Sequence, residues 1–136
     1  GPETAMTLRC FLDGLHSTGV AVNLDPANFE MVTGDDPVRA VYTLREYIVH
    51  THAKDGIRYY AEDPIVVYTG HSAEDVIVTS AAFEEMALGE GAVDYDRYLK
   101  ALEDIGYRGY LTIEREVGDN PEADIAKAVA FLKSKY

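Results

Sequence analysis

Residues 20–28 read Val-Ala-Val-Asn-Leu-Asp-Pro-Ala-Asn, an alternating run that ends in an acidic residue followed by proline. Successive side chains of a strand point to opposite faces, so Val22 and Leu24 share one face, while Asn23 and Asp25 share the other. The run therefore predicts a strand with one apolar face and one face that becomes polar toward its end.

Two further runs have the same construction. Residues 48–52 read Ile-Val-His-Thr-His and residues 110–114 read Tyr-Leu-Thr-Ile-Glu, so both also end in polar residues on one face. A parallel strand covered by helices on both faces should be almost continuously apolar. These three strands have polar residues on one face. This indicates that helices cover one side of the strands only, and that the other side is an inner face lining the mouth of a barrel.

Amphipathic helical patterns alternate with the three strands. The first places Leu8, Phe11, Leu12 and Leu15 on one face that we expect to be buried, together with the neighbouring Cys10. The other three are expected to begin at Asp36-Pro37, Asp94 and Asn120-Pro121, each with a capping residue at its start. Strands separated by helices cannot form hairpins, so the order predicts an α/β fold with parallel strands joined by right-handed crossovers.

One segment does not follow this spacing. Residues 57–91 are too long for a simple loop between a strand and a helix, and loops of this length usually carry function. Within it, residues 65–68 and 76–78 are expected to form a small hairpin. The whole chain, residues 1–136, is read as a single domain without a linker.

Composition excludes several classes of partner. The chain has 24 acidic and 12 basic residues, a formal net charge of −12, which would repel a nucleic-acid backbone. Its apolar runs are short and interrupted by charge, and no charged-then-apolar leader opens it, so we expect a cytoplasmic protein without membrane association.

Asp25, His52 and Glu114 each stand at the C-terminal end of a predicted strand. Active sites of βα barrels are built at these ends. Two carboxylates and an imidazole form a mixed oxygen and nitrogen ligand set, suited to Mn²⁺, Co²⁺, Zn²⁺ or Fe²⁺. Each residue also has a simpler reading: Asp25 as the start of a turn before proline, His52 (like His50) as a core histidine, and Glu114 as solvated charge. The shared strand position is what favours a metal site.

Five ordered motifs then identify a resemblance. They are Gly-Pro-Glu-Thr-Ala at 1–5, Val-Asn-Leu-Asp-Pro-Ala-Asn at 22–28, Val-His-Thr-His-Ala-Lys-Asp-Gly at 49–56, Leu-Gly-Glu-Gly at 88–91 and Gly-Tyr-Leu-Thr-Ile-Glu-Arg-Glu at 109–116. Together they resemble the xylose isomerase-like sugar phosphate isomerase/epimerase family. The resemblance implies a partial TIM (β/α)8 barrel, comprising about strands six to eight with four helices.

The resemblance also implies roles for individual residues. Asp25, His52 and Glu114 would hold a divalent Mn²⁺, Co²⁺ or Zn²⁺ ion, and Glu114 would also be catalytic. It would move a proton next to the carbonyl of a small sugar, sugar phosphate or ketose through a metal-stabilised enediolate. Substrate-binding roles are expected for the residues that the motifs place around the ligands: Asn28, His50, Lys54 and Arg58.

The chain also departs from the family pattern. A full barrel takes about 250 residues, and family members carry a fourth ligand, a glutamate at the end of strand five, just ahead of the Gly-Pro-Glu-Thr stretch. We do not assign that role to Glu3, because its motif position belongs to the helix start. The 136 residues are therefore expected to be a fragment whose activity alone is in doubt. A half barrel exposes two strand edges, so we expect a homo-oligomer that covers them.

Three other functions stay open from the sequence. A DNA endonuclease of the same superfamily would use a multinuclear zinc site on DNA. The acidic composition disfavours it, as do the four histidines, two of which, His16 and His71, lie outside the strand-end cluster. An inosose dehydratase-like lyase would share the same ligand types. The chain could also be a non-catalytic interaction domain that has kept the fold.

Overall fold

The computed structural model describes residues 2–70 and 81–136, and its centre is a small parallel sheet. The sheet contains β1 (Val22–Leu24), β2 (Ile48–Ala53) and β5 (Leu111–Ile113) in that order, with both pairs parallel. The predicted parallel strands are confirmed, although β1 and β5 are shorter than expected. Asn23 lies opposite His50 and His52 opposite Thr112, so these polar residues share one face of the sheet.

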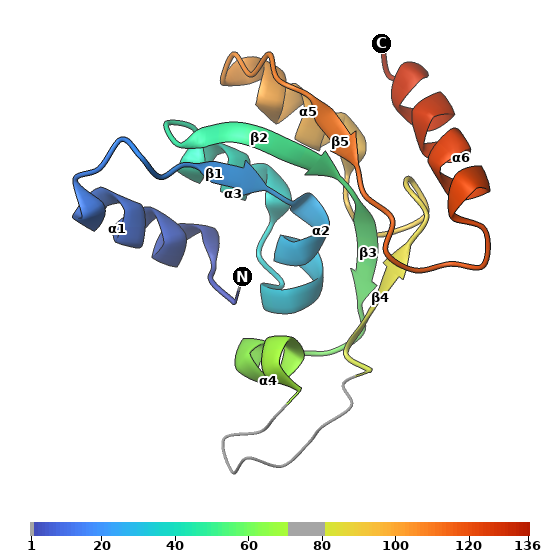
Figure 1. Cartoon of the computed structure of the whole chain (residues 1–136), viewed down its shortest axis with the longest axis horizontal. Helices are drawn as coiled ribbons and strands as arrows, with labels where there is room; N and C mark the ends of the chain where they lie inside the picture. The colour runs from blue at the N-terminus through green and yellow to red at the C-terminus, as the bar shows by residue number, and fades with distance from the viewer. Residues whose placement is uncertain (1, 71–80) are drawn as a thin grey trace.

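Helices cover the other face of the sheet. In Figure 1, α3 lies behind β1 and β2, while α1 and α6 lie toward opposite sides of the molecule. The four long helices are α1 (Ala5–Leu15), α3 (Pro37–Leu44), α5 (Tyr95–Asp104) and α6 (Pro121–Lys133). Three further elements were not predicted: α2 (Pro26–Asn28), the π-helical turn η1 (Phe29–Thr33) and α4 (Pro64–Thr69).

The predicted helix starts are confirmed at three caps. The Asp36 carboxylate accepts a hydrogen bond from the Val38 N–H at 2.8 Å, and Asp94 and Asn120 accept from N–H groups three residues on, each at 3.1 Å. These side chains satisfy amides that have no partner within the helix. At the other end of α5, Gly106 adopts a positive φ of 74°, which ends that helix as expected.

The core lies between the sheet and the helices α3 and α5. Leu24, Leu44, Val41 and Tyr98 are fully buried there. Thr51, on the helix-facing side of β2, donates its hydroxyl to the Leu24 carbonyl at 2.8 Å and also contacts the Tyr98 hydroxyl. This polar contact inside the core ties β1, β2 and α5 together.

The burial predicted for α1 is wrong in part. Ala5 and Leu12 are buried, but Phe11 is 58% exposed, Leu15 is also exposed, and so is Cys10. The apolar spacing was read correctly as a helix, but only one side of that helix meets α3. The rest of the apolar surface of α1 faces outward.

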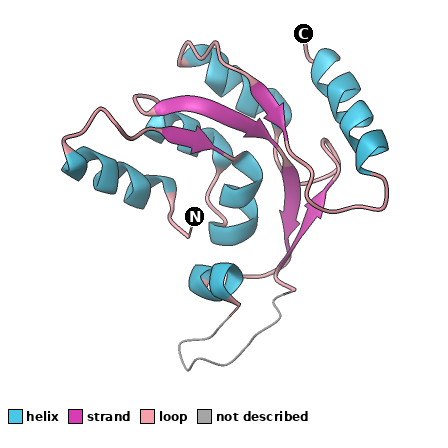
Figure 2. Cartoon of the chain, in the orientation of Figure 1, coloured by secondary structure: helices cyan, strands magenta, loops and turns pink. Residues whose placement is uncertain are grey.

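The predicted hairpin is also wrong where it can be compared. Residues 65–68 lie in α4, while residues 76–78 lie outside the described residues. Asp63 caps α4 by accepting from the Ile65 N–H at 2.9 Å, and Pro64 occupies the first helical position, so these helix-starting signals outweigh the β-branched side chains that follow. The hairpin observed instead pairs β3 (Asp55–Arg58) with β4 (Phe83–Met86), as Figure 2 shows.

Asp55 anchors the long segment at its far end. Its carboxylate is buried and accepts hydrogen bonds from the N–H groups of Gly56, Gly89, Gly91 and Val93 at 2.9 to 3.1 Å. Burial raises the pKa of Asp55, and the four N–H donors oppose this rise. One side chain therefore holds the loop that leads into α5.

None of the helices within residues 2–70 and 81–136 is long and apolar enough to cross a membrane.

We expect Asp55→Ala to lower the free energy of unfolding by about 3 kcal/mol, because several N–H groups would lose their acceptor in a buried setting. Asp63→Ala is the matched control, since Asp63 is exposed and caps one N–H, and its loss should cost about 1 kcal/mol. Urea denaturation followed by circular dichroism measures both. Equal effects would show that Asp55 does not anchor the loop.

Candidate metal centre

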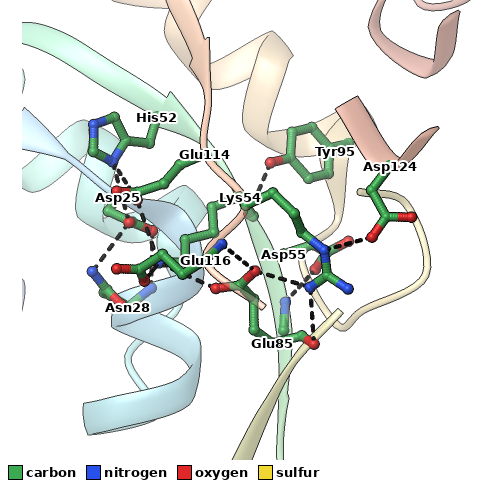
Figure 3. Close-up of polar contacts among 12 residues, drawn as sticks. Asp25, Asn28, His52, Lys54, Asp55, Glu85, Tyr95, Glu114, Glu116 and Asp124 are labelled. Atoms are coloured by element: carbon green, nitrogen blue, oxygen red, sulfur yellow. Dashed lines mark hydrogen bonds and ion pairs between the residues drawn. The ribbon is translucent and has the colours of Figure 1, made fainter. Parts of the chain in front are cut away.

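Asp25, His52 and Glu114 meet at the C-terminal end of the parallel sheet. Asp25 follows β1, His52 lies near the end of β2, and Glu114 follows β5. One ligand atom from each lies within 4.8 Å of the others. His52 Nδ1 is 2.9 Å from Glu114 Oε2 and 3.4 Å from Asp25 Oδ2, so the imidazole lies between the two carboxylates (Figure 3).

Asp25 also accepts two hydrogen bonds from Asn28. Its Oδ1 accepts from the Asn28 N–H and its Oδ2 accepts from the Asn28 side-chain amide, both at 3.0 Å. Asp25 is thus the N-cap of α2. The two interpretations of Asp25 from the sequence, the start of a turn before proline and a metal ligand, are therefore compatible in one side chain. Asp25 is only 9% exposed, and this burial raises its pKa. Asn28, Lys54 and His52 act to lower the pKa, but burial has the larger effect.

The two histidines of the His-x-His motif differ in their surroundings. Nδ1 of His52 faces the carboxylates, while its Nε2 lies 3.1 Å from the Asn23 side-chain nitrogen. His50 Nε2 lies 2.9 Å from the Thr112 hydroxyl and does not reach the carboxylates. A metal-binding imidazole donates its other ring N–H. Asn23 would therefore orient His52 for metal binding with its side-chain oxygen, rather than its nitrogen, turned toward Nε2.

Lys54 is buried beside the cluster with 3% of its surface exposed. Its ammonium lies 3.3 Å from Glu114 Oε2 and 3.4 Å from Glu85 Oε2, and it is also ion-paired with Glu116. Burial lowers the pKa of Lys54, but its bond to Glu116 and the charges of Asp25, Glu114 and Glu85 together raise it above the usual value. Lys54 is therefore charged at neutral pH.

The charge of Lys54 also affects the pKa of Glu114. Burial alone would raise the pKa of Glu114, but the charges of Lys54 and His52 outweigh it and hold the pKa below its ordinary value. Behind Lys54, Glu85 Oε1 accepts from Arg115 Nη1 at 2.9 Å, and Arg115 Nε donates to Asp124 in α6 at 2.9 Å. Ion pairs thus run from the candidate ligands to the last helix.

The cluster opens into a cavity of about 330 Å³. Of the residues assigned from the sequence, Asp25, Asn28, His52, Lys54 and Glu114 line it. His50 and Arg58 are not in its lining. Arg58 lies against Gly34 and donates from Nε to the Tyr60 carbonyl at 3.3 Å. Their roles in substrate binding stay predictions.

Other residues of the cavity were missed by the sequence reasoning. Glu116 lies two residues beyond Glu114, a spacing that places both on one side of an extended chain and could have identified it. Tyr68 lines the cavity from α4, which was predicted as a strand. Glu3, which was not assigned a role from the sequence, also lines the cavity just before α1.

The donor set fits a divalent cation. Two carboxylates and an imidazole nitrogen converge from separate strands, and all three residues line a cavity beside a single ammonium group. Oxygen and nitrogen ligands of this kind suit Mn²⁺, Co²⁺ or Zn²⁺. Lys54 stabilises the concentrated negative charge from its position beside Glu114.

Comparisons with known proteins agree with this geometry. The sequence model of the Xylose isomerase-like TIM barrel family matches residues 1–135. A solved structure of a xylose isomerase domain protein from Planctomyces limnophilus is 30% identical, with a TM-score of 0.78, over 99% of this chain and 44% of that one. A D-tagatose 3-epimerase-like protein has the same fold at 20% identity, with a TM-score of 0.65 over 97% of this chain and 40% of its own. The α/β fold with parallel strands thus matches part of such a barrel, as predicted.

The similarity to curated proteins is more local. L-ribulose-5-phosphate 3-epimerase UlaE of Salmonella paratyphi B is 38% identical over 55 residues, which are 39% of this chain and 19% of that protein. The same enzyme from Salmonella typhi matches over the same extent. The chain thus spans about a fifth of these relatives and less than half of the solved structures.

We expect Lys54→Met to lower the free energy of unfolding by about 3 kcal/mol at pH 7, because it leaves Glu114 and Glu116 close together without their shared countercharge. The lowered pKa of Glu114 contributes stability above its unfolded pKa of about 4.3, which is lost as pH falls through the folded pKa. The difference between the two proteins should therefore shrink as the solution is acidified below about pH 5.

Lys100→Met provides the control, since Lys100 is exposed and paired with Glu103 and Asp104 on the surface. It should cost about 0.5 kcal/mol. Chemical denaturation at a series of pH values measures both variants. A Lys54→Met penalty that does not change with pH would contradict the electrostatic explanation.

Proposed function

Because the chain belongs to the xylose isomerase-like TIM barrel family, we propose that it carries a metal-binding part of a sugar isomerase or epimerase. The observation that supports this most is the convergence of Asp25, His52 and Glu114 from three parallel strands. The local similarity to L-ribulose-5-phosphate 3-epimerases adds support for a sugar substrate. The activity belongs to the whole protein, of which these residues form part of the site.

In this proposal Asp25, His52 and Glu114 would hold a divalent Mn²⁺, Co²⁺ or Zn²⁺ ion. When bound, such an ion polarises a carbonyl oxygen and stabilises the negative charge that develops on an enediolate. Asp25 and His52 are fixed by Asn28 and Asn23, so they enter the site already oriented. Preorganised ligands of this kind need little rearrangement during the reaction.

Glu114 is the proposed proton carrier. Its carboxylate lines the cavity, and the charges of Lys54 and His52 keep its pKa low, so it is ionised at neutral pH. A carboxylate in this state accepts a proton from the carbon next to a carbonyl. An epimerase also needs a second group on the opposite face of the substrate to return a proton, because return by Glu114 to the same face would restore the substrate. Asn28 lines the same cavity and offers an amide to substrate hydroxyl groups.

An inosose dehydratase-like lyase would use the same three ligands. It stays the second candidate, because both reactions begin with the removal of a proton next to a carbonyl. Product analysis separates them, since a dehydratase releases water and an epimerase returns an isomer of equal mass.

Metal binding is the first test of the proposed function, because the proposal requires a bound divalent ion. The wild-type chain is expected to bind about one equivalent of Mn²⁺, Co²⁺ or Zn²⁺, and Asp25→Ala to weaken the affinity by at least about 100-fold, because it removes a ligand outright. Equilibrium dialysis followed by elemental analysis measures the stoichiometry. Asp96→Ala, an exposed carboxylate paired with Lys135, should bind as the wild type does.

If the chain binds no metal at any pH between 6 and 8, the result would favour a non-catalytic interaction domain that has kept the fold.

We also propose that the chain self-associates. Within the described residues, β1 and β5 each pair with β2 alone, so each has one edge without a strand partner. Large apolar side chains are exposed near these strands, including Tyr110 at 81% and Val49 at 66%. Unpaired edges with exposed apolar side chains favour association.

Sedimentation velocity is expected to show a dimer at micromolar concentration. Tyr110→Lys should shift it toward the monomer, because a charge next to β5 opposes pairing at that edge. Tyr136→Lys, at the equally exposed chain end, is the control. A folded monomer in the wild-type chain would contradict the proposal.

A further inference from the structure

We propose that the cavity at the candidate metal centre takes an uncharged sugar or sugar derivative and disfavours a phosphorylated one. The inference rests on the proposed function and narrows the substrate class of the same site. It is carried by the charged groups that line the cavity and by how each of them is already bonded.

The lining of the cavity is acidic. Four carboxylates face it, those of Glu3, Asp25, Glu114 and Glu116, against the single ammonium of Lys54. Beside a bound divalent cation the lining would still carry net negative charge. A phosphate monoester brings a further charge of about −1.5 to −2 at pH 7, so it would be repelled.

The Lys54 ammonium is already paired with carboxylates of the chain. An ammonium group has three N–H donors, and the Lys54 ammonium contacts three carboxylates, those of Glu85, Glu114 and Glu116. The side chain is 3% exposed, so it cannot swing toward a ligand without breaking these ion pairs. Binding a phosphate there would release carboxylates that are now neutralised.

The other cations of the chain do not line the cavity. Arg115 is bonded to Glu85 and Asp124, and Arg58 lies against Gly34 with a bond to the Tyr60 carbonyl. Residues 71–80, whose structure is not described, contain neither Lys nor Arg in their sequence. Among all 12 basic residues, Lys54 alone is in the described lining.

The position of these acidic groups adds to the argument. TIM barrels frequently bind phosphate in the loops after strands seven and eight. By the resemblance, these strands are β2 and β5, and the segments that follow them place Lys54, Glu114 and Glu116 around the cavity (Figure 3). The place where a phosphate is commonly held is thus occupied by internally paired charges.

A second chamber of about 440 Å³ adjoins the first. The two share Asn28, Lys54, Tyr68 and Glu116 in their linings. The rest of the second chamber is largely apolar, with Met31, Val32, Val67, Phe83 and Val117 in its walls. A substrate group that reaches past Tyr68 therefore meets apolar side chains and carboxylates. Sugar hydroxyl groups can donate to those carboxylates, whereas a phosphate can only accept.

A matched pair of ligands tests the inference. The chain, loaded with Mn²⁺, is titrated by calorimetry with L-ribulose and with L-ribulose 5-phosphate. The uncharged sugar should bind at least about tenfold more tightly. Raising the ionic strength to about 0.2 M should strengthen binding of the phosphate and leave that of the neutral sugar unchanged, because salt screens repulsion.

Glu116→Gln should bring the two affinities closer together, since it removes one carboxylate and frees a donor of Lys54. Glu103→Gln makes the same charge change on the surface of α5 and should leave the ratio unchanged. The salt series needs no variant and so decides the matter even if Glu116→Gln does not fold.

If L-ribulose 5-phosphate binds as tightly as L-ribulose or more tightly, and salt weakens its binding, the inferred preference for an uncharged sugar is wrong. The proposed function would not be affected by that result. Metal binding without detectable binding of the neutral sugar would also count against the inferred preference. A chain that binds no metal would instead contradict the proposed function itself.

Discussion

The buried ammonium of Lys54 is the interaction on which the site depends. It connects three carboxylates from two separate segments: Glu114 and Glu116 after β5, and Glu85 in β4. A concentration of acidic groups this close would be costly without a cation between them. The same ammonium lowers the pKa of Glu114, so a contact that stabilises the fold also sets the protonation state of the proposed catalytic group.

Lys54 and Asp55 are neighbours in sequence, but they act in different parts of the structure. Lys54 reaches the candidate metal centre, whereas Asp55 accepts four N–H groups of its own turn and of the loop before α5. Neighbouring residues of an extended chain point to opposite sides, which permits this division. The site and the loop are thus both held at the bend between β2 and β3.

The sequence allowed the parallel strands, the long helices and the metal cluster to be predicted, because each has a local signal. Strand alternation placed Asp25, His52 and Glu114 on the strand ends, and the capping residues Asp36 and Asn120 marked helix starts. Burial was harder to predict, since Phe11 and Cys10 lie on a helix whose partner on that side cannot be inferred from periodicity. The roles of Glu85 and Arg115 depend on contacts between segments 30 residues apart, for which the sequence carries no local signal.

Asp25 illustrates how two requirements restrict one position. It caps α2 through the Asn28 N–H, and its other oxygen faces His52. Asparagine would cap the helix as well but would lose the negative charge, while glutamate would keep the charge on a side chain that caps poorly. Aspartate alone of the three meets both the capping requirement and the charge requirement of the proposed metal site. A substitution at position 25 in a related protein would therefore indicate that the proposed metal binding has been lost there.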